Sequence, residues 1–235
     1  MNTILKDVRE ALSAQGDVAR SENAQRFFKE PVALYGVTSA AVRAIAKQGL
    51  ARLKGVSKQE VFTLCEQLWQ SGLLEEGGIA CEWSYAMRKQ YVPEDLALFG
   101  TWLEQYVNNW ASCDTLCNHS VGALLTTFPE CAQTVFAWSQ SANRWKKRGA
   151  AVSLIIPARN GLFVREALNT ADALLRDPDD MIQKGYGWLL KVASVQHPEE
   201  VYAFILERKH DMPRTALRYA LEKYPKDLRT KAMKA

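Results

Sequence analysis

Residues 147–152 read KRGAAV, and two later stretches, QKGYGW at 183–188 and PRTALR at 213–218, repeat the pattern of a cation followed by small residues. The first residues of the three stretches are 36 and 30 positions apart. Each stretch is expected at the start of a helix. A period in the thirties predicts stacked pairs of helices, because one pair cannot bury its apolar face alone.

A second series of helix starts, out of phase with the first, follows prolines. Its members are Pro93, Pro129, Pro198 and Pro225, each with an acidic residue close behind. Proline suits the first helical position, where its missing N–H has no partner to lose, and acids favour the positive end of the helix. The gap of 69 residues between Pro129 and Pro198 is close to two periods, which predicts a further start near 161–164.

Apolar residues at steps of three and four predict helices through most of the remaining chain. The clearest segments are 8–14, 39–53, 58–69, 94–107, 173–178 and 200–210. We therefore predict an all-α fold with one repeat domain over residues 1–235, an α-solenoid of stacked antiparallel helix pairs of the HEAT-like or armadillo-like type. The second helix of each pair is expected to line the concave side of a curved superhelix, where the cation series forms a basic groove.

The composition is that of an ordinary globular protein, with 48% hydrophobic and 24% charged residues. No apolar run reaches the roughly 18 residues of a membrane span, and Lys6 and Arg9 interrupt the N-terminal segment where a signal peptide needs an apolar core. These features predict a cytoplasmic protein with no membrane partner.

Charge is distributed unevenly along the chain. Residues 144–235 carry 18 Lys and Arg against 11 Asp and Glu, a net charge of +7, whereas residues 1–143 carry 12 against 15, a net charge of −3. A basic second half is compatible with a polyanionic partner. A solvated surface with no such partner is the alternative interpretation of charge alone.

The cysteine pattern favours buried, reduced thiols. Five cysteines, an odd number, lie within apolar helical stretches. Cys113 and Cys117 lie near His119, but their spacing matches no strong zinc pattern. We expect no metal site.

Four motifs, taken together, resemble a known family. They are LYGVTSAAVRAIAK at 34–47, NNWASCD at 108–114, RWKKRGAAVSL at 144–154 and MIQKGYGWLLKVA at 181–193. In this order and spacing the chain resembles, over nearly its full length, the AlkD-like DNA alkylation repair glycosylases, which are built from HEAT-like repeats.

The resemblance implies a set of site residues. The family's catalytic aspartate matches Asp114, its two active-site tryptophans match Trp110 and Trp188, its phosphate-contacting arginine matches Arg148, and Lys191 falls at a further basic DNA contact. Two positions depart from the family pattern. Phe27 stands where the family has a tyrosine, and Asn109 stands where it often has the first of two tryptophans.

Other cations are weaker candidates for contacts with DNA. Lys184 precedes Trp188 by one helical turn on the same face, and Arg43 and Lys47 share a helix face in the same way. The remaining candidates in the cation series are Lys147 and Arg214.

The implied reaction is hydrolysis of the N-glycosidic bond of purines alkylated at N3 or N7 in duplex DNA. Alkylation makes the base cationic, so the leaving group needs no strong general acid. Asp114 would stabilise the sugar oxocarbenium and position water, and the indole faces would attract the cationic unit. Water is the nucleophile, so we expect no cofactor, and no lysine is placed for Schiff-base chemistry, so we expect a monofunctional enzyme that acts as a monomer. The resemblance implies that the base stays unflipped, in contrast to glycosylases that extrude it.

Structural and functional alternatives stay open at this stage. Asp114 has an alternative role as a helix N-cap, Trp110 and Trp188 as packing residues, and Arg148 as a surface charge. The other four tryptophans predicted to lie in or near the core are Trp69, Trp83, Trp102 and Trp138. The alternative functions are a non-catalytic relative that recognises bent or branched DNA, and a HEAT-type scaffold that binds a protein.

Overall fold

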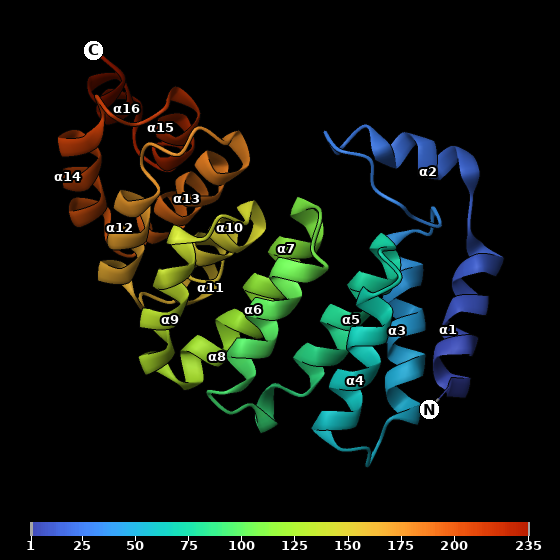
Figure 1. The fold of residues 1–235 in the computed structure, drawn as a ribbon. Helices are drawn as coiled ribbons and strands as arrows, with labels where there is room; N and C mark the ends of the chain where they lie inside the picture. Colours follow the sequence, from blue (N-terminus) through green and yellow to red (C-terminus); the bar gives the residue numbers. More distant parts are fainter. Residues whose placement is uncertain (1, 235) are drawn as a thin grey trace. The chain divides into compact units, whose positions relative to one another are not determined.

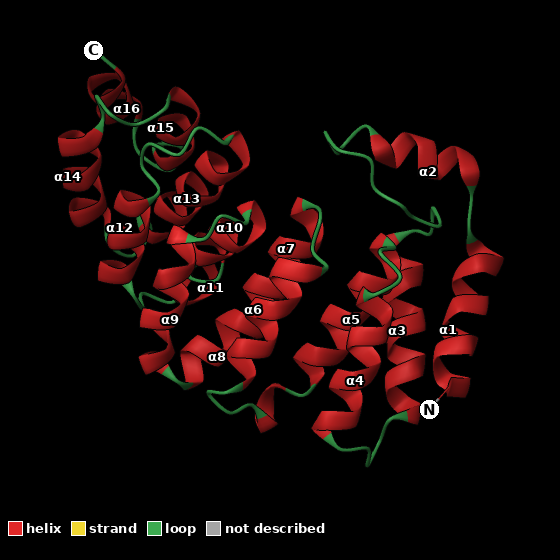
Figure 2. Cartoon of the chain, in the orientation of Figure 1, coloured by secondary structure: helices red, strands yellow, loops and turns green. Residues whose placement is uncertain are grey.

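All regular secondary structure in the described part of the chain is helical, as the computed structural model of residues 2–234 shows (Figures 1 and 2). The all-α prediction is confirmed. The chain forms two compact units, Met1–Leu116 and Cys117–Ala235. The prediction of one repeat domain over 1–235, with a curved shape and a basic concave groove, stays a prediction. No helix among residues 2–234 is long and apolar enough to cross a membrane.

Unit 1 is a stack of helices in which alternate members pack together. Its elements are α1 (Asn2–Gln15), α2 (Val18–Gln25), α3 (Ser39–Arg52), α4 (Lys58–Trp69), α5 (Leu74–Ala86), the short 3₁₀ helix η1 (Arg88–Gln90), α6 (Asp95–Gln105) and α7 (Trp110–Leu116). Helix α5 packs between α3 and α7, and α4 covers α5 (Figure 1). Contacts between alternate helices are expected when the second helix of one pair packs on the second helix of the following pair.

Unit 2 continues the same pattern. Its elements are the π-helical turn η2 (Cys117–Val121), α8 (Gly122–Thr127), η3 (Pro129–Cys131), α9 (Ala132–Ala137), η4 (Trp138–Gln140), α10 (Arg144–Val152), α11 (Ile155–Arg159), α12 (Val164–Ala173), α13 (Asp180–Ala193), α14 (Pro198–Arg208), α15 (Arg214–Ala220) and α16 (Lys226–Met233). Helices α10, α13 and α15 pack on one another in succession. These three helices carry the cation series found in the sequence.

Several helix starts differ from the sequence prediction. Val164 opens α12 and Pro198 opens α14, as predicted, but Pro225 precedes α16 by one residue. Lys147 and Lys184 lie inside their helices, because α10 already begins at Arg144 and α13 at Asp180. The predicted helix over 173–178 is wrong, since α12 ends at Ala173 and a turn follows.

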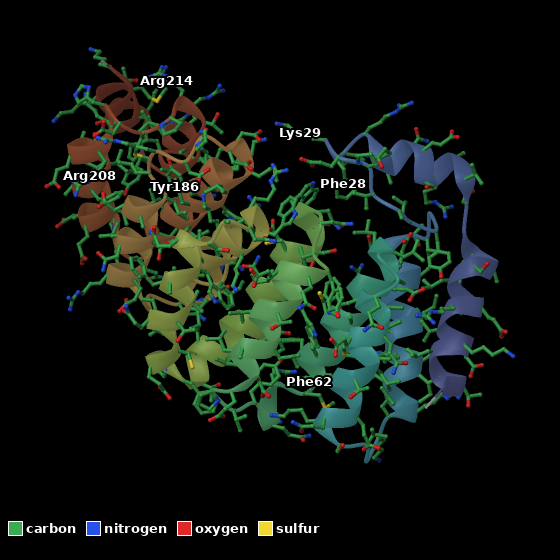
Figure 3. All side chains as sticks on the ribbon, viewed as in Figure 1. Phe28, Lys29, Phe62, Tyr186, Arg208 and Arg214 are labelled. Atoms are coloured by element: carbon green, nitrogen blue, oxygen red, sulfur yellow. The ribbon has the colours of Figure 1, made fainter. Side chains whose placement is uncertain are left out.

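Aromatic side chains dominate the core between α4 and α6. The ring of Phe62 (labelled in Figure 3) packs edge-on against Phe99 and Trp102, at centroid distances of 5.8 Å for each pair. The four tryptophans assigned to the core, Trp69, Trp83, Trp102 and Trp138, are all buried, and the five cysteines are buried and form no disulfide. Both predictions are confirmed.

A buried ion pair joins the first turns of α4 and α6. Lys58 Nζ donates to Asp95 Oδ2 at 2.7 Å and to Oδ1 at 2.9 Å, and the two side chains are 9% and 7% exposed. Asp95 Oδ2 also accepts a hydrogen bond from the Val92 amide at 2.9 Å. The carboxylate of Asp95 is therefore satisfied by three hydrogen bonds, and the pair fixes the position of α6 along α4.

Replacing one partner is therefore expected to cost more than replacing both. Asp95→Ala leaves the Lys58 ammonium buried and unpaired, which lowers the free energy of unfolding by about 3–5 kcal/mol. The double variant Lys58→Met/Asp95→Leu is expected to lose much less, because no buried charge remains. Urea unfolding measures both values, and equal losses in the two variants would contradict the prediction.

Candidate active site

Helix α7 carries both Trp110 and Asp114, and Asn109 determines where it begins. Asn109 is 4% exposed, and its side-chain oxygen accepts a hydrogen bond from the Ser112 amide at 2.9 Å. An asparagine in this geometry is an N-cap, a position that favours Asn, Asp and Ser. Asn109, which stands where the family often has the first of two tryptophans, therefore caps the start of α7. The alternative role of Asp114 as an N-cap is wrong, because Asp114 lies inside α7.

Trp110 and Asp114 lie one helical turn apart on the same face of α7, and both are partly exposed. An indole and a carboxylate in this arrangement can both face a ligand that approaches the helix from that side. The spacing that the sequence predicted is therefore realised in a helix.

The indole of Trp110 is held by the segment that follows α2. Its N–H donates to the carbonyl oxygen of Phe27 at 3.1 Å, and its ring stacks on Phe28 with a centroid distance of 5.6 Å and an interplanar angle of 27°. Phe28 lies on this segment in Figure 3. One face of the indole is thereby covered by protein, and its orientation is fixed before any ligand binds.

Gln25, the last residue of α2, holds the two ends of this segment together through hydrogen bonds to residues 30 and 32. The Gln25 side chain donates to the Glu30 carbonyl at 2.9 Å and accepts from the Val32 amide at 2.9 Å. The loop presents the side chain of Phe27 outward, with 75% of its surface exposed. The aromatic ring that stacks on Trp110 is that of Phe28, whereas Phe27 contacts Trp110 through its carbonyl oxygen. Arg26 and Lys29, close to Phe27 in sequence, are also exposed, and the contact of Phe27 with DNA stays a prediction.

Two buried carboxylates of α5 anchor the next segment. Glu75 accepts hydrogen bonds from the backbone amides of Tyr35, Gly36 and Val37 at 3.0, 2.9 and 3.0 Å. Glu76 accepts from the Tyr35 hydroxyl at 2.8 Å and pairs with Arg9 at 3.1 Å. Burial, followed by the hydrogen bond to Glu76, raises the pKa of Tyr35 to about 12.

A cavity of about 310 Å³ lies beside α7 within unit 1, and Arg43, Gly78, Ala111 and Thr115 are among its lining residues. Small side chains on α5 and α7 create the space. Arg43 places a cation there. Lys47, one turn further along α3, is exposed.

In unit 2, Trp188 and Arg148 occupy different environments. Trp188 is partly exposed on α13. The preceding Gly187 allows close packing on α15, because an added Cβ would lie 3.0 Å from the Ala216 oxygen. Arg148 is 5% exposed and donates to the Met181 carbonyl, so the alternative role of a surface charge is wrong. Its contact with a phosphate stays a prediction.

The three predicted lysine contacts of unit 2 each have a carboxylate partner. Lys147 pairs with Asp177 at 2.6 Å, Lys184 with Asp180 at 3.0 Å, and Lys191 with Glu222 at 2.6 Å. Sequence reasoning missed these pairs. Asp177 and Glu222 lie about 30 residues from their lysines, whereas Asp180 precedes Lys184 by one helical turn, a spacing that the sequence does show. The exposed Arg214 (labelled in Figure 3) donates to the Met233 carbonyl at 3.1 Å.

Comparison with known proteins identifies the family. The model of the DNA alkylation repair enzyme family matches residues 8–224. The chain belongs to this family. A solved structure described as a predicted DNA alkylation repair enzyme from Enterococcus faecalis shares the fold, with a TM-score of 0.81 and 18% identity over 90% of this chain and 98% of that chain. No curated protein matches.

The described residues contain no group of three or more His, Cys, Asp or Glu side chains placed to hold a metal ion. Cys113 and Cys117 are buried and form no disulfide, and His119 is exposed.

The contact between Phe28 and Trp110 can be measured through a double-mutant cycle. Phe28→Ala and Trp110→Ala are expected to show a coupling energy of about 1 kcal/mol in the free energy of unfolding, the range for a stacked aromatic pair. Phe28→Leu keeps the bulk but removes the ring, so it should retain part of the stability. Additive effects of the two alanine substitutions would show that the rings do not interact in solution.

Proposed function

We propose that this member of the DNA alkylation repair enzyme family is a monofunctional glycosylase. It hydrolyses the N-glycosidic bond of cationic N3- and N7-alkylated purines in duplex DNA. Asp114 is the proposed catalytic carboxylate, and Trp110 and Trp188 are the proposed indoles that receive the cationic nucleoside.

One observation carries the proposal: a carboxylate and an indole with a fixed orientation share one face of α7. The stack on Phe28 and the hydrogen bond to Phe27 restrict the indole, so little conformational freedom is lost when a ligand binds. An aromatic face attracts a cation by about 0.5–2 kcal/mol, depending on how far the site is desolvated. This preference matches an alkylated purine, whose ring carries a formal positive charge.

Asp114 is suited to the chemical step that follows. As the glycosidic bond breaks, positive charge moves from the base to the deoxyribose, and a nearby carboxylate stabilises the charge that develops there. The same carboxylate can accept a proton from the attacking water. The base leaves as a neutral purine, so the step needs no organic cofactor, metal or strong general acid. The resemblance to AlkD-like glycosylases supports a mode in which the base is not flipped into a pocket.

Cations of both units are proposed to bind the phosphates of the duplex. Arg43, Lys47 and Arg214 are exposed, whereas Lys147, Lys184 and Lys191 are paired with carboxylates that a phosphate would have to replace. Arg148, held by the Met181 carbonyl, is proposed to contact a phosphate from a fixed position. We further propose a cytoplasmic enzyme that acts as a monomer.

The central test is the single-turnover release of 7-methylguanine from a duplex oligonucleotide. Asp114→Asn keeps the shape of the side chain but removes its charge, so we expect the rate to fall at least about a hundredfold, the cost typical of losing a main electrostatic stabiliser. Affinity for the duplex should stay close to that of the wild type. Asp211→Asn is the matched control, because it removes one carboxylate from a surface ion pair with Arg176.

Two results would count against the proposal. Unchanged release by Asp114→Asn would remove the catalytic role of this carboxylate. A wild-type protein that binds duplex DNA in a salt-dependent way but releases no methylated base would favour the non-catalytic DNA-binding alternative.

A further inference from the structure

The net positive charge of the protein is concentrated in its last two helices. Residues 213–235 carry seven Lys and Arg against two Asp and Glu, a net charge of +5. Residues 1–212 carry 23 against 24, a net charge of −1, so the two parts sum to the +4 of the whole chain. A charge gathered in 23 residues creates a local positive potential that a weakly charged chain otherwise lacks.

Within these residues α15 and α16 form a hollow of about 510 Å³. Its polar lining consists of Thr215, Arg218, Tyr219, Glu222 and Arg229. The side chains of Arg218 and Arg229 are exposed, one from each helix. The lining thus offers two guanidinium groups and two hydroxyl groups, a set of donors suited to an anion with several oxygen atoms.

Glu222 carries the one carboxylate among the described residues that line the hollow. Its Oε1 lies 2.6 Å from Lys191 Nζ, although half of the Glu222 side chain is exposed. The hydrogen bond from Lys191 lowers the pKa of Glu222, and the charges of Lys191, Lys223 and Arg229 lower it further. Glu222 is therefore an internal counter-ion among three cations.

The walls of the hollow are fixed to the rest of unit 2. Arg214 donates to the Met233 carbonyl at 3.1 Å, Lys209 to the Lys234 carbonyl at 2.7 Å, and the Tyr202 hydroxyl to the Leu228 carbonyl at 2.9 Å. These bonds tie α16 to neighbouring parts of unit 2 at several points along its length. Arg229 is consequently carried on an anchored helix, which favours a preformed site over a flexible basic tail.

We propose that this hollow binds a phosphate of the DNA backbone, with Arg218 and Arg229 as its cations and Glu222 as the counter-ion that the phosphate replaces on Lys191. The inference rests on the duplex DNA partner of the proposed function, and it adds a binding site apart from Trp110 and Asp114. Replacement conserves charge, because one singly charged phosphodiester takes the place of one carboxylate. A phosphate that does not reach Lys191 leaves the carboxylate of Glu222 in the hollow. Glu222 therefore weakens the binding of DNA whose phosphates are not positioned to replace it.

Substitutions of opposite sign test this inference in two directions. Arg218→Gln/Arg229→Gln should weaken binding to undamaged duplex DNA and reduce the slope of log affinity against log salt by about one for each phosphate that the variant no longer neutralises. Glu222→Gln frees Lys191 and should raise the affinity by up to about fivefold, the range for a surface charge pair, while making the salt dependence steeper. The measurement is a fluorescence anisotropy titration at several salt concentrations.

Lys54→Gln/Lys89→Gln is the matched control, because it removes two exposed cations from unit 1. An equal loss of affinity in the two double variants would overturn the inference, since it would trace the effect to net charge alone. Unchanged or lower affinity of Glu222→Gln would also overturn it. Equal binding of polyglutamate and duplex DNA by the wild type would contradict recognition of phosphate.

These titrations are independent of catalysis. If the wild type binds the duplex as expected but releases no methylated base, the hollow remains supported while the proposed glycosylase activity fails. If release occurs and the Arg218 and Arg229 substitutions leave binding unchanged, the inference fails and the activity stands. Thermal melting of each variant identifies any loss of folding.

Discussion

Two carboxylates buried in α5 are the constraint on which the site in unit 1 depends. Glu75 and Glu76 are 5% and 1% exposed, so each must be satisfied by hydrogen bonds or an opposite charge. Glu75 meets this requirement with three consecutive backbone amides of residues 35–37, and Glu76 with Arg9 and the Tyr35 hydroxyl. The chain between α2 and α3 therefore has a fixed end, from which it reaches Trp110 through Phe27 and Phe28.

The two units use charge in different ways. In unit 1 Glu75 fixes the backbone of residues 35–37, and the Phe27 carbonyl oxygen accepts a hydrogen bond from the indole of Trp110. In unit 2 Lys147 of α10 and Lys184 and Lys191 of α13 are paired with carboxylates, so the proposed binding of phosphate would require an exchange of partners. Such an exchange contributes less affinity than binding of phosphate to an unpaired cation. It also disfavours DNA whose phosphates are not positioned to replace the carboxylates.

Much of the fold was predictable from the sequence, because helices leave a local signal. The apolar steps over 58–69 coincide with α4, and the period in the thirties placed the start of α12 close to Val164. The predicted helix over 173–178 is wrong because Leu174 and Leu175 are buried in a turn that follows α12. Burial of this kind depends on tertiary contacts, which the spacing of apolar residues does not reveal. For the site, the spacing of Trp110 and Asp114 was readable, whereas the stack on Phe28 and the partner of Lys191 join residues far apart in the chain.

The proposed mechanism predicts that the wild-type enzyme selects its substrates by the charge on the base. Single-turnover release is measured from three otherwise identical duplexes that contain 7-methylguanine, 3-methyladenine or the neutral lesion O6-methylguanine. The proposed carboxylate and indoles act on a leaving group that its own charge already activates. We therefore expect release of the two cationic bases, and no release of the neutral base above the uncatalysed rate. Release of O6-methylguanine at a comparable rate would contradict this mechanism, because a neutral base leaves only with the help of a general acid or a base-specific pocket.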